Sequence, residues 1–193
     1  GFFRPADEET GSTSNQGEIL YLNASKFNDD MYDGLATVAH EFQHMINYNQ
    51  KFIRDGAFPK KIEEVTFDEG FSVNSEELNG FSLTSQGGGN SFIFGTAKNY
   101  LANPAQQAFF QFSNNLADYG AGYLYIRYLW SRFGEGILNQ LVTSPDVGRA
   151  NMTQVLGIPF PQAFQDWAVT NQISGLSGQA PTNLTYAEGF STR

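Results

Sequence analysis

Both histidines of this 193-residue chain lie four positions apart, in the segment TVAHEFQHMINYNQ at residues 37–50. On a helix, side chains four residues apart lie on the same face, so His40 and His44 would present two imidazoles to one point with Glu41 beside it. Apolar residues recur around them at helical spacing, which predicts a helix that buries one stripe and turns its histidine face to a cleft. That stripe consists of Leu35, Val38, Ala39, Phe42, Met45 and Ile46.

The H-E-x-x-H spacing is typical of a zinc site at which the glutamate acts on a bound water without being a ligand. Two histidines in 193 residues rarely fall into this pattern by chance. Two alternatives stay open: the imidazoles could hydrogen-bond within the fold, or they could hold a closed, structural zinc.

A catalytic zinc usually has three protein ligands and a water, and here the third must be a carboxylate, because no cysteine or further histidine exists. The metzincin continuation is excluded, since Asn47 and Gln50 occupy its glycine and third-histidine positions. We choose Glu69, because Gly70 follows it where a helical glycine costs about 1 kcal/mol and indicates close approach of another backbone. Glu76 is the alternative. The carboxylates considered are Asp55, Glu63, Glu64, Asp68, Glu69, Glu76 and Glu77.

The segments HEFQHMINYNQK and DEGFS resemble the gluzincin branch of the zinc metallopeptidases, and most closely the hyicolysin-like group of bacterial secreted neutral peptidases. The resemblance covers about residues 18–142. It implies that His40 and His44 are zinc ligands, Glu41 the catalytic base and Glu69 the third ligand. It also implies a secreted, extracellular protein with a protein or peptide substrate.

The same resemblance implies three weaker roles. Asp68, directly before the third ligand, would support one histidine. Val73 stands where an acid would support the other, so Glu76 or a backbone carbonyl must orient His40. The YGAG motif beginning at Tyr119 resembles a Y-x-x-G pattern whose tyrosine stabilises the oxyanion, and the alternative is an ordinary amphipathic tyrosine.

The composition limits the partners. A formal charge of -9 with few, scattered Lys and Arg argues against nucleic acid or an anionic lipid surface. No apolar run reaches the twenty or so residues needed to cross a bilayer, so no membrane partner is expected. The composition carries no signal for the oligomeric state.

The whole pattern predicts an α+β fold that is predominantly helical, a zincin-like catalytic domain with a small N-terminal sheet. GEILYLN at residues 17–23 is apolar on both faces, which is typical of an inner strand. A second helix is expected from near Pro59 to a stop at Asn79 and Gly80, and a flexible loop beside a short strand or hairpin over residues 79–104. Gly134 is expected to separate two later helices.

We expect one domain over residues 1–193, and because one clear strand makes a poor sheet, we interpret the chain as a truncated part of a longer protein. Further short helices are expected to begin at Asn151 and Pro161. The expected parts are a sheet part (1–30), the zinc-binding helices (31–80), a helical part (81–175) and an irregular tail (176–193).

Three acids, Asp29, Asp30 and Asp33, cluster where the first helix should begin. Carboxylates are favourable at the positive end of a helix dipole, and a Ca²⁺ site is the alternative interpretation.

The function predicted from the sequence is that of a zinc-dependent endopeptidase. A binding module stabilised by a structural zinc and a zinc hydrolase acting on small amides or esters are the competing hypotheses.

Overall fold

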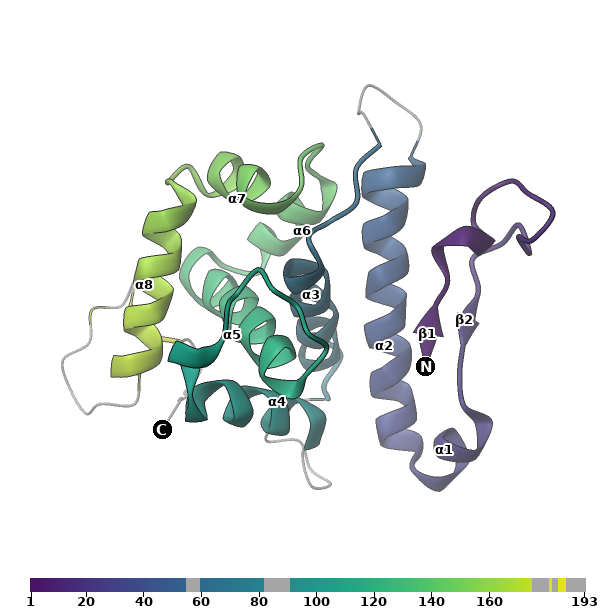
Figure 1. The fold of residues 1–193 in the computed structure, drawn as a ribbon, viewed down its shortest axis with the longest axis horizontal. Helices are drawn as coiled ribbons and strands as arrows, with labels where there is room; N and C mark the ends of the chain where they lie inside the picture. The colour runs from purple at the N-terminus through teal and green to yellow at the C-terminus, as the bar shows by residue number, and fades with distance from the viewer. Residues whose placement is uncertain (55–59, 82–90, 175–180, 182–183, 187–193) are drawn as a thin grey trace.

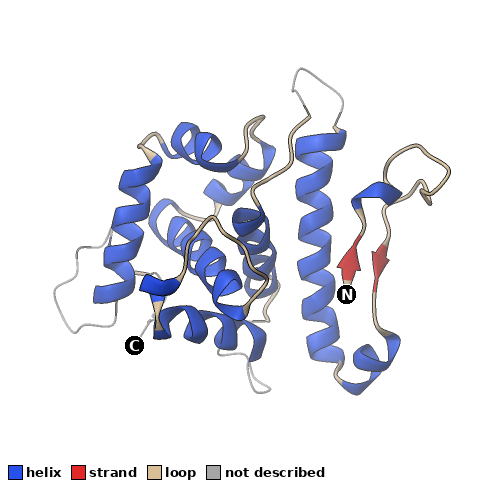
Figure 2. Cartoon of the chain, viewed as in Figure 1, coloured by secondary structure: helices blue, strands red, loops and turns tan. Residues whose placement is uncertain are grey.

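The fold was obtained as a computed structural model that describes residues 1–54, 60–81, 91–174, 181 and 184–186. It is mostly helical, with one two-stranded antiparallel sheet near the N-terminus, which confirms the expected α+β class (Figures 1 and 2). The elements are β1 (Phe2–Phe3), β2 (Leu20–Tyr21), α1 (Ala24–Asp29), α2 (Met31–Tyr48), a π-helical turn η2 (Asn49–Ile53), α3 (Val65–Leu78), α4 (Ser91–Ala102), α5 (Leu116–Phe133), α6 (Gly136–Thr143), α7 (Gly148–Leu156) and α8 (Phe160–Ile173), with 3-10 turns at Pro5–Asp7 and Pro104–Gln106.

Helix α5 is the centre of the core, with α3 and α4 packed against it, and α3 lies between α5 and α2 (Figure 1). Its start is fixed by a capping box in which Asn115 and Asp118 each bond the other's backbone N–H. Gly134 has a positive φ of 83° and ends α5 before α6, as predicted. Among the described helices, none combines the length and apolarity that crossing a membrane requires.

Helix α2 begins at the predicted acid cluster. Asp30 is its N-cap, and the side-chain Oδ1 of Asp30 accepts hydrogen bonds from the backbone N–H groups of Tyr32 and Asp33. In the part of the chain that the structure describes, Asp29, Asp30 and Asp33 do not form a group that could hold a metal. The Ca²⁺ alternative is therefore not supported: Asp30 caps α2, and Asp33 lies in its first turn, where a carboxylate is favourable.

The predicted apolar stripe of α2 is only partly buried. Met45 lies in the core, but Leu35 and Phe42 are 44% and 48% exposed, so the prediction is wrong at these two positions. The reason is the position of α2 in the fold: it packs on α3 along one side, while the short β1–β2 ribbon contacts it from the other (Figure 1).

Three other expectations need correction. Residues 17–23 do not form an inner strand: only Leu20–Tyr21 is a strand, and β1 is its one partner among the described residues. The second helix begins at Val65; Pro59 lies outside the described residues. Instead of a strand or hairpin, α4 forms within residues 79–104, while the glycine run at 87–89 lies outside the described residues, as does most of the tail.

The late start of α3 has a visible cause in the residues before it. The backbone N–H of Lys61 donates to the carbonyl of Lys51, the ammonium of Lys61 pairs with Asp146, and the Glu63 carboxylate accepts the N–H of Gly148 at 2.6 Å. These contacts hold residues 60–64 extended against η2 and the chain around α6 and α7. Sequence patterns cannot reveal such distant partners.

A buried lysine joins η2 to the chain after α6. The Nζ of Lys51, a residue 4% exposed, donates to the carbonyl oxygens of Leu141, Ser144 and Asp146 at 2.6, 2.9 and 2.7 Å. We predict that Lys51→Met lowers the free energy of unfolding by about 2–4 kcal/mol, because two buried carbonyls and one partly buried carbonyl lose their donor. Urea unfolding measures the change. The control Lys61→Met removes a half-exposed ion pair and should cost less than about 1 kcal/mol; equal losses would contradict the account.

Candidate metal centre

The two histidines of α2 and one carboxylate of α3 meet at a single point. The Oε2 of Glu69 lies 3.2 Å from His40 Nε2 and 3.5 Å from His44 Nε2. Among the described residues, these three form the one group of His and acidic side chains close enough to hold a metal ion, with one ligand atom from each lying within 4.8 Å of the others. The structure thus brings together the three residues that the sequence singled out.

Two features of the chain create this convergence. The four-residue spacing puts His40 and His44 on one face of α2, with ring centroids 4.9 Å apart. On α3, a Cβ added at Gly70 would lie 2.6 Å from the carbonyl oxygen of Gly122. The prediction that Gly70 marks a close backbone approach is therefore confirmed, and the neighbour is α5.

Each imidazole is also held through its other nitrogen. His40 Nδ1 lies 2.8 Å from Glu76 Oε1, and His44 Nδ1 lies 2.8 Å from Asp68 Oδ2. Because carboxylates accept hydrogen bonds, each Nδ1 carries a proton, and each Nε2, the nitrogen that a metal would take, faces Glu69. Glu76 thus sits on the far side of His40 and does not belong to the three-residue cluster.

Two polar residues complete this support, and sequence reasoning missed both. Asn47, 2% exposed, donates its side-chain N–H to Asp68 Oδ1 at 2.7 Å, and the Ser72 hydroxyl lies 3.1 Å from His44 Nδ1. The signal for Asn47 was available: it lies three residues after His44, hence on the same helical face. No local pattern distinguishes Ser72 from other helical serines.

The other acids considered as ligands lie elsewhere. Glu63 accepts the N–H of Gly148, Glu64 pairs with Arg149 at 3.7 Å, and Glu77 pairs with Arg127 at 3.1 Å. Asp55 lies outside the described residues.

The donor set fits zinc. A tetrahedral zinc with N and O ligands at about 2.0–2.2 Å separates neighbouring ligand atoms by roughly 3.3–3.6 Å. The separations of 3.2 and 3.5 Å between Glu69 Oε2 and the two Nε2 atoms match these edges. Two imidazoles and one carboxylate are also a donor set that leaves a fourth position for solvent.

The short distances between these side chains also shift their pKa values when no metal is bound. Burial lowers the pKa of both imidazoles, but the carboxylate partners outweigh it and raise the pKa of His40 to about 9 and that of His44 to about 10. Burial raises the pKa of Glu69, and the two imidazoles outweigh this and bring it down to about 2. Without a metal, the centre is therefore a cluster of imidazolium and carboxylate groups, and a metal must displace protons.

Glu41 lies beside the cluster and outside it. Its Oε2 accepts the backbone N–H of Phe3 at 2.9 Å, a contact that sequence reasoning could not foresee because the donor is main chain. Two cavities of about 510 and 760 Å³ open on either side, and both are lined by His40 and Glu41. The two cavities share His40, Glu41 and Tyr119 in their lining, and together they are called the groove below.

Tyr119 lines both of these cavities. Its hydroxyl donates to Asn114 Oδ1 at 2.7 Å. Burial, with the negative charges of Glu69 and Glu41, raises the pKa of Tyr119 to about 12, so the hydroxyl keeps its proton. The structure therefore puts Tyr119 at the groove with a proton to donate.

A comparison with known proteins found a partial similarity to a metalloprotease. No protein-family model matches the chain. Over 84 residues, the chain is 32% identical to the neutral metalloprotease ShpI of Staphylococcus hyicus. The match covers 40% of this chain and 19% of that protein, so the chain corresponds to a minor part of its relative. The chain is thus similar, over that segment, to a metalloprotease, and it contains a His, His, Glu group that could hold a metal.

We predict that zinc binding to the metal-free protein strengthens with pH. Since the pKa values near 9 and 10 keep both imidazoles protonated below them, zinc must displace these protons, and the apparent affinity should rise about tenfold to a hundredfold per pH unit between about pH 6 and 8. Calorimetric titration in buffers of different ionisation enthalpy measures affinity and proton release together. An affinity that does not change with pH would contradict the prediction.

We also predict that Glu76→Gln weakens zinc binding by about 10- to 100-fold, because His40 loses the charged partner that orients it. Competition with a chromophoric chelator measures the affinity. Glu135→Gln, an exposed change at the start of α6, is the control and should leave it unaltered. Equal affinities for parent and Glu76→Gln would show that Glu76 does not support the site.

Proposed function

We propose that this chain carries the catalytic centre of a secreted zinc endopeptidase of the gluzincin type, related to the hyicolysin-like neutral peptidases. The observation that carries the proposal is the convergence of two Nε2 atoms and the Glu69 carboxylate beside a glutamate that faces a groove. The segment of 84 residues that is 32% identical to a neutral metalloprotease supports it independently.

In this proposal, His40, His44 and Glu69 are the zinc ligands. A bound zinc supplies Lewis acidity and lowers the pKa of water toward neutrality. Glu41 takes a proton from the attacking water and passes it to the leaving amine. The N–H of Phe3 holds one oxygen of the Glu41 carboxylate, which leaves the other oxygen for the proton transfer.

Tyr119 is proposed to donate a hydrogen bond to the oxyanion that develops on the scissile carbonyl. The raised pKa supports this role, because the phenol stays protonated at neutral pH. To reach a substrate, the hydroxyl must exchange its present acceptor, Asn114 Oδ1.

An extended peptide is proposed to lie along the sheet edge beside the centre. Residues 17–23 supply β2, and β1 pairs with one side of it. Phe2 and Phe3 of β1 line the larger of the two cavities at Glu41, so β1 borders the groove. The substrate would therefore pair with β1 rather than with β2.

The competing hypothesis of a closed structural zinc is less consistent with these observations. A structural zinc is held by four protein ligands, whereas the described residues supply three, and cavities open on both sides of the cluster. A hydrolase of small amides or esters would share the centre, so activity on casein against a small ester discriminates between them.

The first test is Glu41→Gln. We predict a fall in the rate of casein hydrolysis of about 10²- to 10⁴-fold, since the amide cannot accept the proton, with zinc content and unfolding midpoint unchanged. The control Glu18→Gln removes an exposed carboxylate of the N-terminal segment and should keep the parent rate. A zinc-loaded Glu41→Gln protein with the full rate would refute the mechanism.

The second test is Tyr119→Phe. We predict that turnover falls by about a hundredfold while KM changes by less than about twofold, because the hydrogen bond forms only in the transition state. Steady-state kinetics on a peptide substrate separates the two constants. Unchanged turnover would remove Tyr119 from the proposed mechanism.

A further inference from the structure

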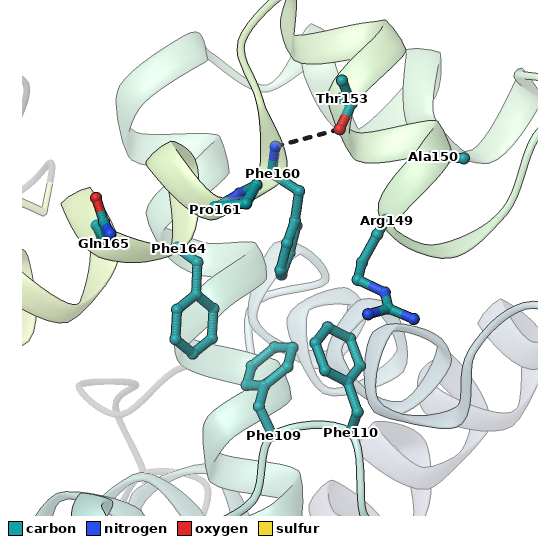
Figure 3. A pocket seen from close by; sticks show the side chains of 9 residues that line it. All are labelled: Phe109, Phe110, Arg149, Ala150, Thr153, Phe160, Pro161, Phe164 and Gln165. Atoms are coloured by element: carbon teal, nitrogen blue, oxygen red, sulfur yellow. Dashed lines mark hydrogen bonds between the residues drawn. The ribbon is translucent and has the colours of Figure 1, made fainter.

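A cavity of about 720 Å³ lies apart from the metal centre, between α7, α8 and the chain before α5 (Figure 3). None of the residues that line it lines the two cavities at His40 and Glu41. The rings of Phe109, Phe110, Phe160 and Phe164 form its apolar wall (Figure 3). The volume is in the range that small-molecule sites usually have.

The aromatic wall is part of the packed core, so the cavity is preformed. Phe109 packs edge-on against Tyr125 and Trp167, with ring centroids 5.4 Å apart in both pairs. Phe164 lies 5.1 Å from Trp167, and the Thr153 hydroxyl accepts the backbone N–H of Phe160 at the start of α8. A ligand entering the cavity would not have to order these side chains first.

Arg149 is the one charged residue among those that line the cavity. Its guanidinium carbon lies 4.7 Å from the centre of the Phe110 ring, and its side chain is 61% exposed. Within the described part of the chain it makes no hydrogen bond, and the nearest carboxylate oxygen, on Glu64, is 3.7 Å from Nε. Guanidinium N–H donors are therefore available at the edge of an apolar cavity, in a chain whose net charge is -9.

We propose that this cavity binds a small amphiphilic anion: an aromatic or alkyl group carrying one carboxylate or sulfonate. The apolar group would be buried against the phenylalanine rings, and the anionic head would accept hydrogen bonds from Arg149, whose planar fork suits a two-oxygen acceptor. A cationic ligand would be repelled by Arg149, and a neutral one would gain only the apolar part. The site is independent of zinc and of the proposed peptidase activity.

The test uses two fluorescent probes with the same aromatic skeleton, anilinonaphthalene sulfonate, which is anionic, and phenylnaphthylamine, which is neutral. The protein is the full chain with Trp130→Phe, which leaves Trp167, packed against Phe164 of the cavity wall, as the only tryptophan whose fluorescence a bound probe can quench. Arg149→Met removes the anion receptor. Ala150→Phe adds a ring at an exposed position of the cavity lining. Lys98→Met is the matched control, because Lys98 also lies over a phenylalanine ring, Phe94, but away from the cavity.

The proposal predicts saturable quenching of Trp167 by the anionic probe. Arg149→Met should weaken the anionic probe by about tenfold or more and the neutral probe by less than about twofold. Ala150→Phe should weaken both probes, and Lys98→Met neither. The proposal is overturned if Trp167 is not quenched, if Arg149→Met weakens both probes equally or neither, or if Ala150→Phe leaves binding intact.

Discussion

The close packing of α3 against α5 sets the position of Glu69 at the metal centre. Gly70 and Gly122 meet where the two helices cross, and a Cβ on either would come within 2.6 or 2.4 Å of a carbonyl oxygen of the other helix. Two polar side chains then fix α3 between its neighbours: Asn74 donates to the Tyr123 carbonyl of α5, and Ser75 donates to the Ala39 carbonyl of α2. Because Glu69 directly precedes Gly70, its carboxylate is held at a set distance from the histidines of α2.

The side chains at the metal centre are partly buried, and they carry more negative than positive charge. Glu69 lies between the two imidazoles, and Asp68 and Glu76 lie behind them. Without a metal, raised imidazole pKa values let protons balance the carboxylates. A divalent cation balances the same charges with neutral imidazoles, and the hydrogen bonds to Asp68 and Glu76 then hold each ring with its Nε2 toward the ion. The same side chains thus suit both states.

Local sequence patterns predicted the residues that meet at the metal centre better than they predicted the contacts around it. The spacing of His40 and His44 and the glycine after Glu69 are local signals, and the three side chains do come together; their role as ligands stays a prediction. Asp68 was expected to support one histidine, and Glu76 or a backbone carbonyl the other; Asp68 and Glu76 lie against the two Nδ1 atoms. The anchoring of Lys51 by three carbonyls was not foreseen, because its partners lie 90 or more positions away in the sequence.

The errors have a common physical origin, because hydrophobicity along the chain does not say what covers a surface. The apolar pattern at residues 17–23 predicts a strand covered on both faces, yet Leu22, directly after β2, is 40% exposed. Helix α4 was missed because the glycine run and polar residues before it favour a loop, although Ile93, Ala97 and Tyr100 follow helical spacing and are buried.

In the function proposed above, two imidazoles and one carboxylate hold a single zinc ion that makes the groove hydrolytic. The most direct measurement is the rate of casein cleavage by chelator-treated protein as zinc is added back in known amounts. We expect a rate near zero without zinc that rises in proportion to the added metal and levels off at one equivalent. A rate that does not depend on zinc, or no cleavage by fully loaded and folded protein, would contradict the account.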